Sequence, residues 1–421
     1  MFMKIHFSGI GGIGLSALAQ MCFAKGHQIQ GSDTSDTSVI WPILKQKGVT
    51  LFTRQTSENI DDSLDLLVYS EAVLATNPER VKAESLNIPQ KSYFEFLGEI
   101  SQTYRTIAIA GTHGKTSTTG LIARALQECK FDANIIVGTA LEFLGNTNFS
   151  AGKEKVLVVE ACEYRENFRF LSPEIVVLTS VEWDHVDAFP TEELYFKAFE
   201  KFVSGAQLVI AHSDDAGAKK VLQNFKGKIH WIDNTQVIDL SILGEFSKRN
   251  ARQALAVGTY LGLDKNIFAK GLQKYVGASR RQEFLGFYKG IKIYDDYAHH
   301  PSEIKALLKA FKSHFSQNKV GIIFEPHQFS RTKQFFSEFL EVLSLADKSA
   351  FYPIYAARDS EQDKQFSLTE HLKNTGIELL QSEAEIQQFL AQFKTDDVVL
   401  FCGAGNISQV AHNFLQKFAK N

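Results

Sequence analysis

The sequence predicts an α/β protein in which three doubly wound, mostly parallel sheets follow one another along the chain. Apolar runs of strand length alternate with helical patterns from the first residues to the last. Glycine-rich turns directly follow three of these runs, at residues 9–14, 111–114 and 403–405. A chain of 421 residues is also too long for a single hydrophobic core. We therefore expect three domains, at residues 1–104, 105–281 and 282–421.

The composition argues against nucleic-acid and membrane partners. The net charge is −3, with 22% charged and 44% hydrophobic residues, so no basic surface is indicated. No apolar run reaches the length of a transmembrane helix, and the N-terminal residues lack a signal-peptide pattern. Cys22, Cys129, Cys162 and Cys402 lack the spacing of a metal site and suit a reducing compartment. We expect a cytoplasmic protein that is a monomer or a homodimer.

The N-terminal domain begins with a strand that enters a turn with glycines at positions 9, 11 and 14. Such glycines permit a tight turn and let the backbone approach a pyrophosphate closely. A second strand ends at Asp33, where an acid that binds a ribose belongs. Ser70 ends a later strand, at the edge where open α/β sheets bind ligands. These features fit a dinucleotide and a UDP-sugar equally well.

The central domain contains the pattern of a phosphate-binding loop. An apolar strand at 106–110 is followed by Gly-Thr-His-Gly-Lys-Thr at 111–116 and then by a helical pattern. Backbone N–H groups and the helix N-terminus would face an anion, Lys115 would reach the outer phosphates, and the Thr116 hydroxyl would bind Mg²⁺. Ile109 occupies the position where the general pattern has its first glycine.

Two other central strands end in polar residues that suit a metal ion. The strand at 155–160 ends at Glu160, and an acid in this place commonly partners Mg²⁺ next to a phosphate loop. The strand at 175–180 runs into His185, which lies between Asp184 and Asp187. A neutral imidazole, available near pH 7, can also bind a cation.

The C-terminal domain repeats the pattern of strands that end in polar clusters. Strands at 291–294, 319–324 and 398–401 are followed by clusters at 295–301, 325–333 and 402–406. Two arginines, Arg280 and Arg281, precede this domain. They suit a phosphate clamp and a salt-bridged domain linker equally well.

Taken together, the motifs resemble those of the Mur ligases of peptidoglycan synthesis, over essentially the whole chain. The matching segments are 9–14, 111–116, 160–163, 184–187, 280–283, 295–301, 326–332 and 403–406. The resemblance implies a Rossmann-like N-terminal domain for a UDP-sugar, a central domain with a P-loop ATPase-type sheet, and a Rossmann-like C-terminal domain. The third domain would bind the incoming amino acid and part of the ATP.

The resemblance also implies an activity and a set of site residues. It is closest to the alanine-adding members, which implies ATP, Mg²⁺, UDP-N-acetylmuramate and L-alanine as ligands. Implied ATP contacts are Gly111, Thr112, His113, Gly114, Lys115, Thr116, Ser117, Asn250, Arg281 and Asp296. Implied UDP-sugar contacts are Gly11, Gly12, Ile13, Gly14, Asp33 and Ser70. Implied metal ligands are Thr116, Glu160 and His185. Tyr297, His327 and Arg331 would contact the amino acid, and Lys115, His299 and Arg331 would be catalytic.

Alternatives stay open at this point. Gln328 stands where alanine-adding members usually have arginine, Arg249 where they have histidine, and Ser180 where they have asparagine. A recycling ligase that adds an L-Ala-γ-D-Glu-diamino-acid tripeptide shares nearly every motif. Residues 9–14 alone would favour a nicotinamide oxidoreductase, but the phosphate loop argues against it. The intact residues Lys115 and Thr116 argue against a non-catalytic UDP-sugar sensor.

Overall fold

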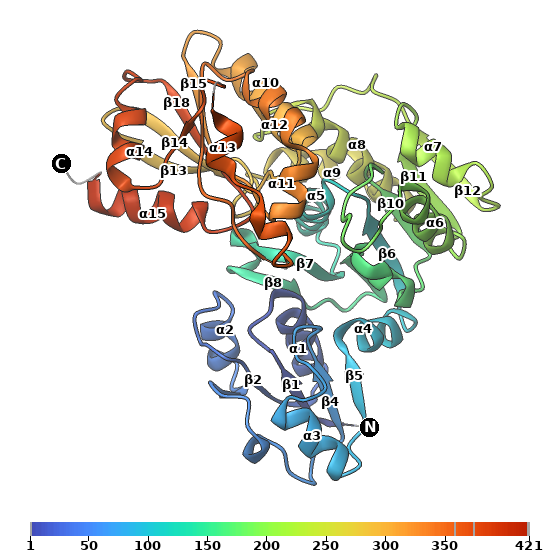
Figure 1. Cartoon of the computed structure of the whole chain (residues 1–421). Helices are drawn as coiled ribbons and strands as arrows, with labels where there is room; N and C mark the ends of the chain where they lie inside the picture. Colours follow the sequence, from blue (N-terminus) through green and yellow to red (C-terminus); the bar gives the residue numbers. More distant parts are fainter. Residues whose placement is uncertain (1, 358, 374, 419–421) are drawn as a thin grey trace. The chain divides into compact units, whose positions relative to one another are not determined.

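A computed structural model describes residues 2–357, 359–373 and 375–418 (Figure 1). By its contacts the chain divides into two compact units. The first contains the chain up to Asp239 together with Arg249–Tyr275, and the second contains Leu240–Lys248 and the chain from Val276 onward. Among the described residues, no helix is both long and apolar enough to cross a bilayer.

The first sheet has five parallel strands in the order β3-β2-β1-β4-β5. They are β1 (Lys4–Ser8), β2 (Gln28–Ser32), β3 (Thr50–Phe52), β4 (Leu66–Tyr69) and β5 (Gln90–Ser92). The connecting helices are α1 (Ile13–Ala24), α2 (Trp41–Gln46), η1 (Ser57–Asn59), α3 (Pro78–Ser85) and α4 (Tyr93–Ser101). The strand order reverses between β1 and β4, and ligands of open α/β sheets bind at the carboxyl ends of strands at such a point. The glycine turn at 9–14 and Ser70 lie at these two ends.

The second sheet has the order β12-β11-β10-β6-β9-β7-β8, and only β8 runs antiparallel. Its strands are β6 (Arg105–Ala110), β7 (Asn134–Leu141), β8 (Thr147–Ser150), β9 (Val156–Glu160), β10 (Ile175–Leu178), β11 (Leu208–His212) and β12 (Lys228–Ile232). Its helices are α5 (Lys115–Glu128), η2 (Glu142–Leu144), η3 (Tyr164–Phe170), α6 (Glu192–Val203), α7 (Ala216–Leu222), α8 (Glu245–Tyr260) and α9 (Lys265–Gln273). The ends of β9, β6 and β10 therefore lie side by side.

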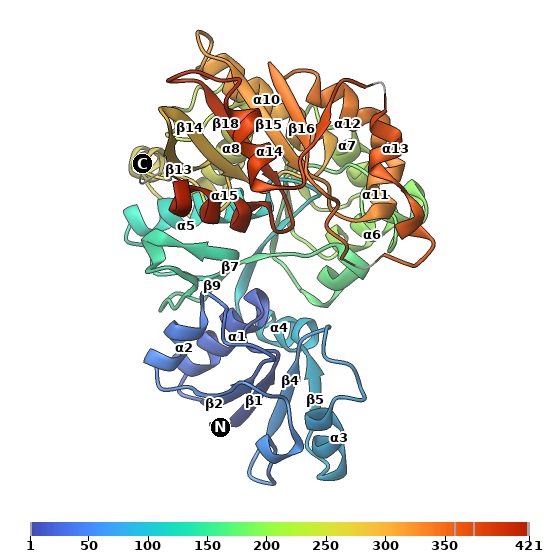
Figure 2. The same cartoon turned by 60° about the vertical axis from the view of Figure 1, so that its left-hand side comes forward.

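The first two sheets share one continuous hydrophobic core. Helix α1 lies beside β7 (Figure 2). It also packs against β8, and α4 packs against η3. Buried side chains also join them: Gln20 donates to Asn148 Oδ1 over 3.0 Å and accepts from the Thr147 hydroxyl over 2.9 Å. Because paired polar groups in a core require one specific geometry, this contact fixes how α1 meets the second sheet.

The third sheet has the order β13-β14-β18-β15-β16-β17, and only β13 runs antiparallel. Its strands are β13 (Glu283–Tyr288), β14 (Ile291–Asp296), β15 (Val320–Glu325), β16 (Lys348–Phe351), β17 (Glu378–Leu379) and β18 (Val398–Gly403). Its helices are α10 (Pro301–His314), α11 (Phe329–Gln334), α12 (Phe336–Leu343), η4 (Asp363–Gln365), α13 (Leu368–Leu372), α14 (Glu383–Leu390) and α15 (Ile407–Phe418).

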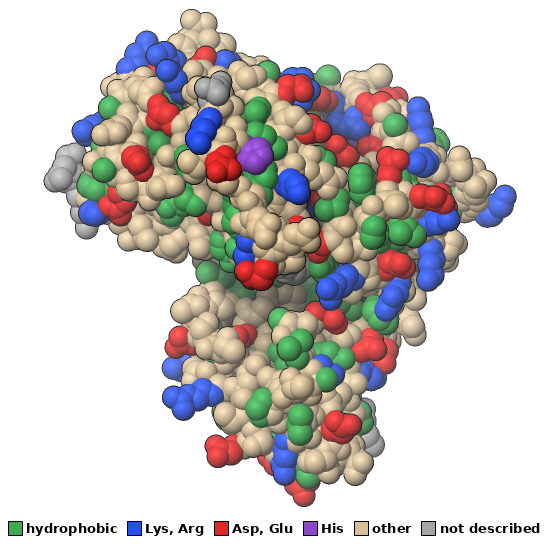
Figure 3. All heavy atoms as spheres, viewed as in Figure 1, with side chains coloured by type: hydrophobic (Ala, Val, Ile, Leu, Met, Phe, Trp, Pro, Cys, Tyr) green, Lys and Arg blue, Asp and Glu red, His purple; other side chains and the backbone are tan. Residues whose placement is uncertain are grey.

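Both faces of the third sheet are covered. Along β15, Ile322 and Phe324 point into one core cluster, whereas Ile323 points into the other. A strand buried on both sides reads as a continuous apolar run, which is the pattern in the sequence. The prediction of three successive, mostly parallel sheets is confirmed. Charged side chains of both signs intermingle over the face shown in Figure 3, in keeping with the small net charge.

His212, at the end of β11, should make the protein sensitive to acid. Its side chain is buried, and its Nε2 lies 3.0 Å from the carbonyl oxygen of Arg249. Burial, and secondarily the Arg249 charge, lower the pKa of His212 from 6.5 to about 4. Below pH 6.5 the unfolded chain therefore binds a proton that the folded chain excludes, so stability falls as the pH falls. The loss is about 2 kcal/mol at pH 5.

Substituting His212→Gln should remove this part of the acid sensitivity, because the amide can still donate to Arg249 but does not titrate. We expect the difference in the free energy of unfolding between pH 8 and pH 5 to shrink by about 2 kcal/mol. Urea unfolding at both pH values measures it. The exposed His314→Gln provides the control, and an equal change in both variants would contradict the prediction.

Candidate active site

The loop between β6 and α5 is fastened to the segment that follows β10. The N–H of Thr112 donates to the Ser180 carbonyl over 2.8 Å, and the N–H of His113 donates to the Ser180 hydroxyl over 3.2 Å. The Thr179 hydroxyl donates to the carbonyl of His113 over 2.6 Å. Ser180, which replaces the usual asparagine, thus still supplies a side-chain acceptor to the loop.

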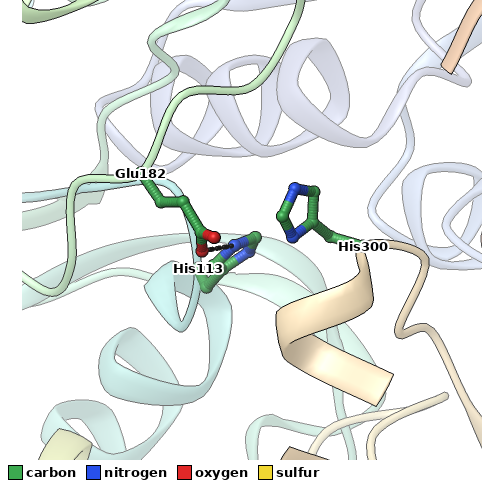
Figure 4. Close-up of side chains that lie close together, drawn as sticks. All are labelled: His113, Glu182 and His300. Atoms are coloured by element: carbon green, nitrogen blue, oxygen red, sulfur yellow. Dashed lines mark hydrogen bonds and ion pairs between the residues drawn. The ribbon is translucent and has the colours of Figure 1, made fainter. Parts of the chain in front are cut away.

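Thr112 links the loop to a second support that the sequence did not reveal. Its Oγ1 accepts from the N–H of Glu182 over 2.9 Å and lies 2.8 Å from the hydroxyl of Tyr195. Tyr195 belongs to α6 and is completely buried. His113 Nε2 lies 3.2 Å from Glu182 Oε2 (Figure 4). The loop is therefore held by hydrogen bonds before any phosphate binds, which is the preorganisation that anion binding requires.

Lys115, the first residue of α5, points back into the loop. Its Nζ donates to the carbonyls of Gly111 and Thr112 over 2.5 and 3.1 Å, and to Glu163 Oε1 over 2.9 Å. The same carboxylate oxygen lies 3.1 Å from His185 Nε2. Burial disfavours the charged forms of both Lys115 and Glu163. The attraction between the two opposite charges outweighs this effect of burial. The pKa of Lys115 is accordingly raised and that of Glu163 is lowered.

Glu163, to which the sequence patterns assign no role, is central to these contacts. Its side chain is buried, and it holds two of the predicted site residues, Lys115 and His185, on one carboxylate. The segment 160–163 signalled it, because two acids three residues apart follow an apolar strand. Since both pKa shifts favour the charged forms, Lys115 is a cation throughout the neutral pH range.

The predicted metal residues are partly assembled. The Thr116 hydroxyl donates to Glu160 Oε2 over 3.0 Å, and Glu160 Oε1 accepts from the N–H of Gly138 over 2.6 Å. His185 contacts Glu163 instead, and its backbone has a positive φ of 55°. The oxygens of Thr116 and Glu160, which lie together, suit a hard divalent cation. These two residues therefore fit Mg²⁺.

Tyr164 supports His185 and the acid that follows it. The ring of Tyr164 meets the His185 ring edge-on, with 5.3 Å between centroids. Its hydroxyl donates to Asp187 Oδ2 over 2.8 Å. The next two residues, Arg165 and Glu166, also have positive φ values of 52° and 56°. Non-glycine residues rarely adopt this conformation, and clusters of them mark functional sites.

Asn250, expected near the adenine, lies against the phosphate loop. A Cβ atom placed on Gly114 would sit 2.8 Å from Asn250 Oδ1. Three residues later in α8, Gln253 donates to the Leu178 carbonyl over 2.7 Å, which holds the helix on the end of β10. Ser117 lies in the first turn of α5. The structure thus brings Asn250, the loop and the start of α5 together.

The glycine turn of the first sheet is held by the acid predicted to bind a ribose. Asp33 Oδ2 accepts from the N–H of Gly11 over 2.8 Å, and Oδ1 accepts from the N–H of Thr34 over 2.7 Å. A Cβ atom on Gly9 would lie 2.9 Å from Ser70 Cβ, so Ser70 borders the turn. Gly12 and Ile13 complete it at the start of α1. The UDP-sugar residues predicted from the sequence therefore lie together.

A buried carboxylate sits beneath this turn. Glu79 Oε2 accepts hydrogen bonds from the hydroxyls of Ser8 and Ser32, and the Ser32 bond measures 2.7 Å. Its Oε1 accepts from Asn59 Nδ2 over 2.7 Å and lies 3.2 Å from His6 Nε2. Burial raises the pKa of Glu79, but these hydrogen bonds outweigh it and the pKa is lowered. Glu79 therefore ties together the ends of β1 and β2.

Glu79→Gln should destabilise the protein, because an amide nitrogen would replace one of the two acceptor oxygens. We expect a loss of about 2 kcal/mol in the free energy of unfolding. Chemical unfolding of the variant measures it. Glu84→Gln, on the exposed face of the same helix, is the matched control and should change stability by less than about 0.5 kcal/mol. Equal stability of the two variants would contradict the assignment.

In the second unit, Asp296 and Tyr297 lie at the end of β14. Asp296 accepts from the N–H groups of Gln282 and Ala298 over 2.8 Å each, and burial raises its pKa to about 6. The guanidinium groups of Arg280 and Arg281 lie 4.8 and 5.1 Å from the centre of the Tyr297 ring. Arg280 and Arg281 also make polar contacts with two different partners.

The two arginines have different surroundings. Arg280 Nη2 donates to the carbonyl of Gly403 over 2.6 Å, which ties it to the turn after β18. Arg281 Nη1 lies 3.8 Å from Glu303 Oε1 at the start of α10. Arg280 is thus tied to the turn after β18, whereas Arg281 faces the start of α10.

The residues predicted to bind the incoming amino acid also lie close together in the second unit. The His299 ring contacts those of Tyr297 and His327, with centroid distances of 5.5 and 6.1 Å. His327 stacks on Tyr355 at 5.5 Å. Arg331 lies in α11, three residues after Gln328, and both side chains are buried. The polar clusters after β14 and β15 thus form one group of side chains.

Family models match three segments of the chain. A model described as Mur ligase family, catalytic domain, matches residues 4–105, and one described as Mur ligase middle domain matches 109–235. A third, described as Mur ligase, glutamate ligase domain, matches 280–405. The segments follow one another in the order that the motifs predicted.

Curated relatives and solved structures match the whole chain. Proteins named UDP-N-acetylmuramate–L-alanine ligase from Clostridium kluyveri and Aquifex aeolicus are both 32% identical, covering 98% of this chain and 98% and 97% of theirs. A crystal structure of UDP-N-acetylmuramate-alanine ligase from Thermotoga maritima is 26% identical with a TM-score of 0.82, covering 99% of both chains. A murein peptide ligase from Psychrobacter arcticus, 22% identical with a TM-score of 0.72 over 100% and 99% of the chains, shares the fold. The chain belongs to the Mur ligase family.

Proposed function

We propose that this protein is an ATP-dependent ligase that joins L-alanine to the lactyl carboxylate of UDP-N-acetylmuramate. The proposal is carried by a preorganised phosphate loop in which Lys115 contacts the buried Glu163 and Thr116 contacts Glu160. This loop occurs in a chain that is similar along its whole length to proteins named UDP-N-acetylmuramate–L-alanine ligase. The products are an amide, ADP and phosphate, as expected for peptidoglycan precursor synthesis.

The first step activates the carboxylate, because a carboxylate and an amine do not condense in neutral water. Phosphoryl transfer from ATP gives an acyl phosphate and ADP. Lys115 would turn from the carbonyls of its own loop to the transferring phosphoryl group and neutralise its growing charge. Mg²⁺ held by Thr116, Glu160 and His185 would supply further neutralisation. Most of the acceleration comes from positioning.

Different residues would contact different parts of ATP. Backbone N–H groups of residues 111–117 and the N-terminus of α5 suit the phosphates. Asn250, in contact with Gly114, suits the adenine side of the loop. Arg281 would reach the γ-phosphate, and Asp296 would accept from the ribose.

In the second step the amine of L-alanine attacks the acyl phosphate, a tetrahedral intermediate collapses and phosphate leaves. Arg331 would bind the carboxylate of the amino acid, and Tyr297 would line its site. His299 and His327 lie in one aromatic group, and either imidazole can accept the proton that the amine releases. We assign the sugar nucleotide to the domain at 1–104, ATP to 105–281 and the amino acid to 282–421.

The experiment that tests the function is phosphate release from ATP, Mg²⁺ and UDP-N-acetylmuramate with two alternative acceptors. L-alanine should support turnover, whereas L-Ala-γ-D-Glu-diamino-acid tripeptide should not. Turnover with the tripeptide alone would overturn the proposal in favour of a recycling ligase. Gln328, in place of arginine, would then be the residue that distinguishes this chain from alanine-adding relatives.

A further inference from the structure

Tyr93, the first residue of α4, lies against the glycine turn of the first sheet. Its place is fixed locally by a capping box: the Ser92 hydroxyl accepts from the N–H of Glu95 over 3.2 Å, and the Glu95 carboxylate accepts from the N–H of Ser92 over 2.7 Å. Helix α4 therefore begins at Tyr93. This places the tyrosine ring at the end of the helix that faces the turn.

The Tyr93 ring covers Gly14. A Cβ atom on Gly14 would lie 2.9 Å from Tyr93 Cζ and 3.1 Å from its hydroxyl oxygen, so the ring would have to shift to admit it. Gly14 stands in the first turn of α1, where the N–H groups of a glycine-rich turn attract a pyrophosphate. The hydroxyl of Tyr93 thus borders the space where that pyrophosphate would lie.

The Tyr93 hydroxyl is a donor that the described residues leave without a hydrogen bond. The side chain is half-buried, so it is only partly hydrated. Burial raises its pKa, and the nearby Cys162 and Glu160 raise it further. The hydroxyl therefore keeps its proton at neutral pH. A partly desolvated donor without a partner is unfavourable unless a ligand completes its hydrogen bond.

We propose that the Tyr93 hydroxyl donates a hydrogen bond to the pyrophosphate of the UDP-sugar. This inference rests on the proposed function, because it assigns a further contact to the site of that substrate. The geometry that carries it is the position of the hydroxyl oxygen over Gly14 in the glycine turn.

The substitution Tyr93→Phe tests this, since it removes the hydroxyl and keeps the ring over Gly14. Calorimetric titration with UDP should show a Kd raised roughly tenfold, the usual effect of losing a hydrogen bond to a charged group. UDP-N-acetylmuramate should lose the same factor, while the Kd of ATP should stay within about twofold. Tyr104→Phe is the matched control: that ring is also half-buried but lies near Lys25 and Lys155 instead.

Each result supports the inference or overturns it. If UDP binds Tyr93→Phe as tightly as it binds the wild type, the hydroxyl makes no such contact. If ATP affinity falls equally, the change acts through the fold, and the inference also fails. Failure of the wild type to bind UDP-N-acetylmuramate would instead overturn the proposed function.

A double-mutant cycle checks the contact itself. In the wild-type background, Gly14→Ala should weaken UDP binding, because the new methyl group displaces the tyrosine ring. In a Tyr93→Ala background the same substitution should cost much less. Equal losses in the two backgrounds would show that the ring does not cover Gly14.

Discussion

Replacing Lys115 by alanine should reduce kcat/KM for ATP at least about a thousandfold, to the background of the assay. The Lys115 ammonium group is the charge best placed to stabilise the phosphoryl group during its transfer, because it is hydrogen-bonded to the loop carbonyls of Gly111 and Thr112. In phosphoryl transfer the protein contributes mainly position and charge. ADP formation in the presence of all substrates measures the effect. UDP-N-acetylmuramate should bind to the variant as it binds to the wild type.

The control for this variant is Lys155→Ala, which removes an exposed lysine of the same domain. Its activity should match that of the wild type. Lys115→Ala also leaves the buried Glu163 with His185 alone, so its stability must be compared at the assay temperature. If the folded variant retains more than about a tenth of wild-type turnover, Lys115 is not the residue that stabilises the transferring phosphate.

Local patterns were sufficient to predict what lies along the chain. Apolar runs followed by glycine turns predicted β1 with the turn at 9–14, and β6 with the turn at 111–114. Because parallel strands end at the same edge of a sheet, they also predicted that Glu160 would lie near the phosphate loop, and it contacts Thr116. Side chains at strand ends are predictable because topology alone collects them.

Contacts between distant segments were not predictable in this way. Tyr195 supports Thr112 from a helix more than eighty residues away, and Glu79 reaches Ser8 and Ser32 from α3. Nothing in the local sequence around Tyr195 or Glu79 distinguishes them from ordinary helix residues. Asp33 was expected to bind a ribose, yet its carboxylate also holds the N–H of Gly11. These supporting roles depend on how distant segments pack together, which cannot be inferred from a single sequence.

Gly111→Ala should also reduce ATP turnover strongly, though less than the loss of Lys115, for a steric reason. Gly111 has a φ of 134°, which alanine rarely adopts, and a Cβ atom there would lie 2.2 Å from Thr179 Oγ1 and 2.7 Å from the Ser180 carbonyl. The second atom is backbone, so the loop must move. A displacement of about 1 Å in a catalytic group costs roughly a hundredfold in rate. We expect kcat/KM for ATP to fall by about that factor.

A second glycine separates backbone strain from collision. Gly48 also has a positive φ, 85°, but no atom lies within 4 Å of the position of its Cβ. Gly48→Ala should therefore cost only about 1 kcal/mol of stability and leave ATP turnover unchanged. If Gly111→Ala behaves like Gly48→Ala, the contact with Thr179 and Ser180 does not position the loop. If it alone loses ATP turnover, the hydrogen bonds that fasten the loop to the end of β10 are what hold the phosphates in place for transfer.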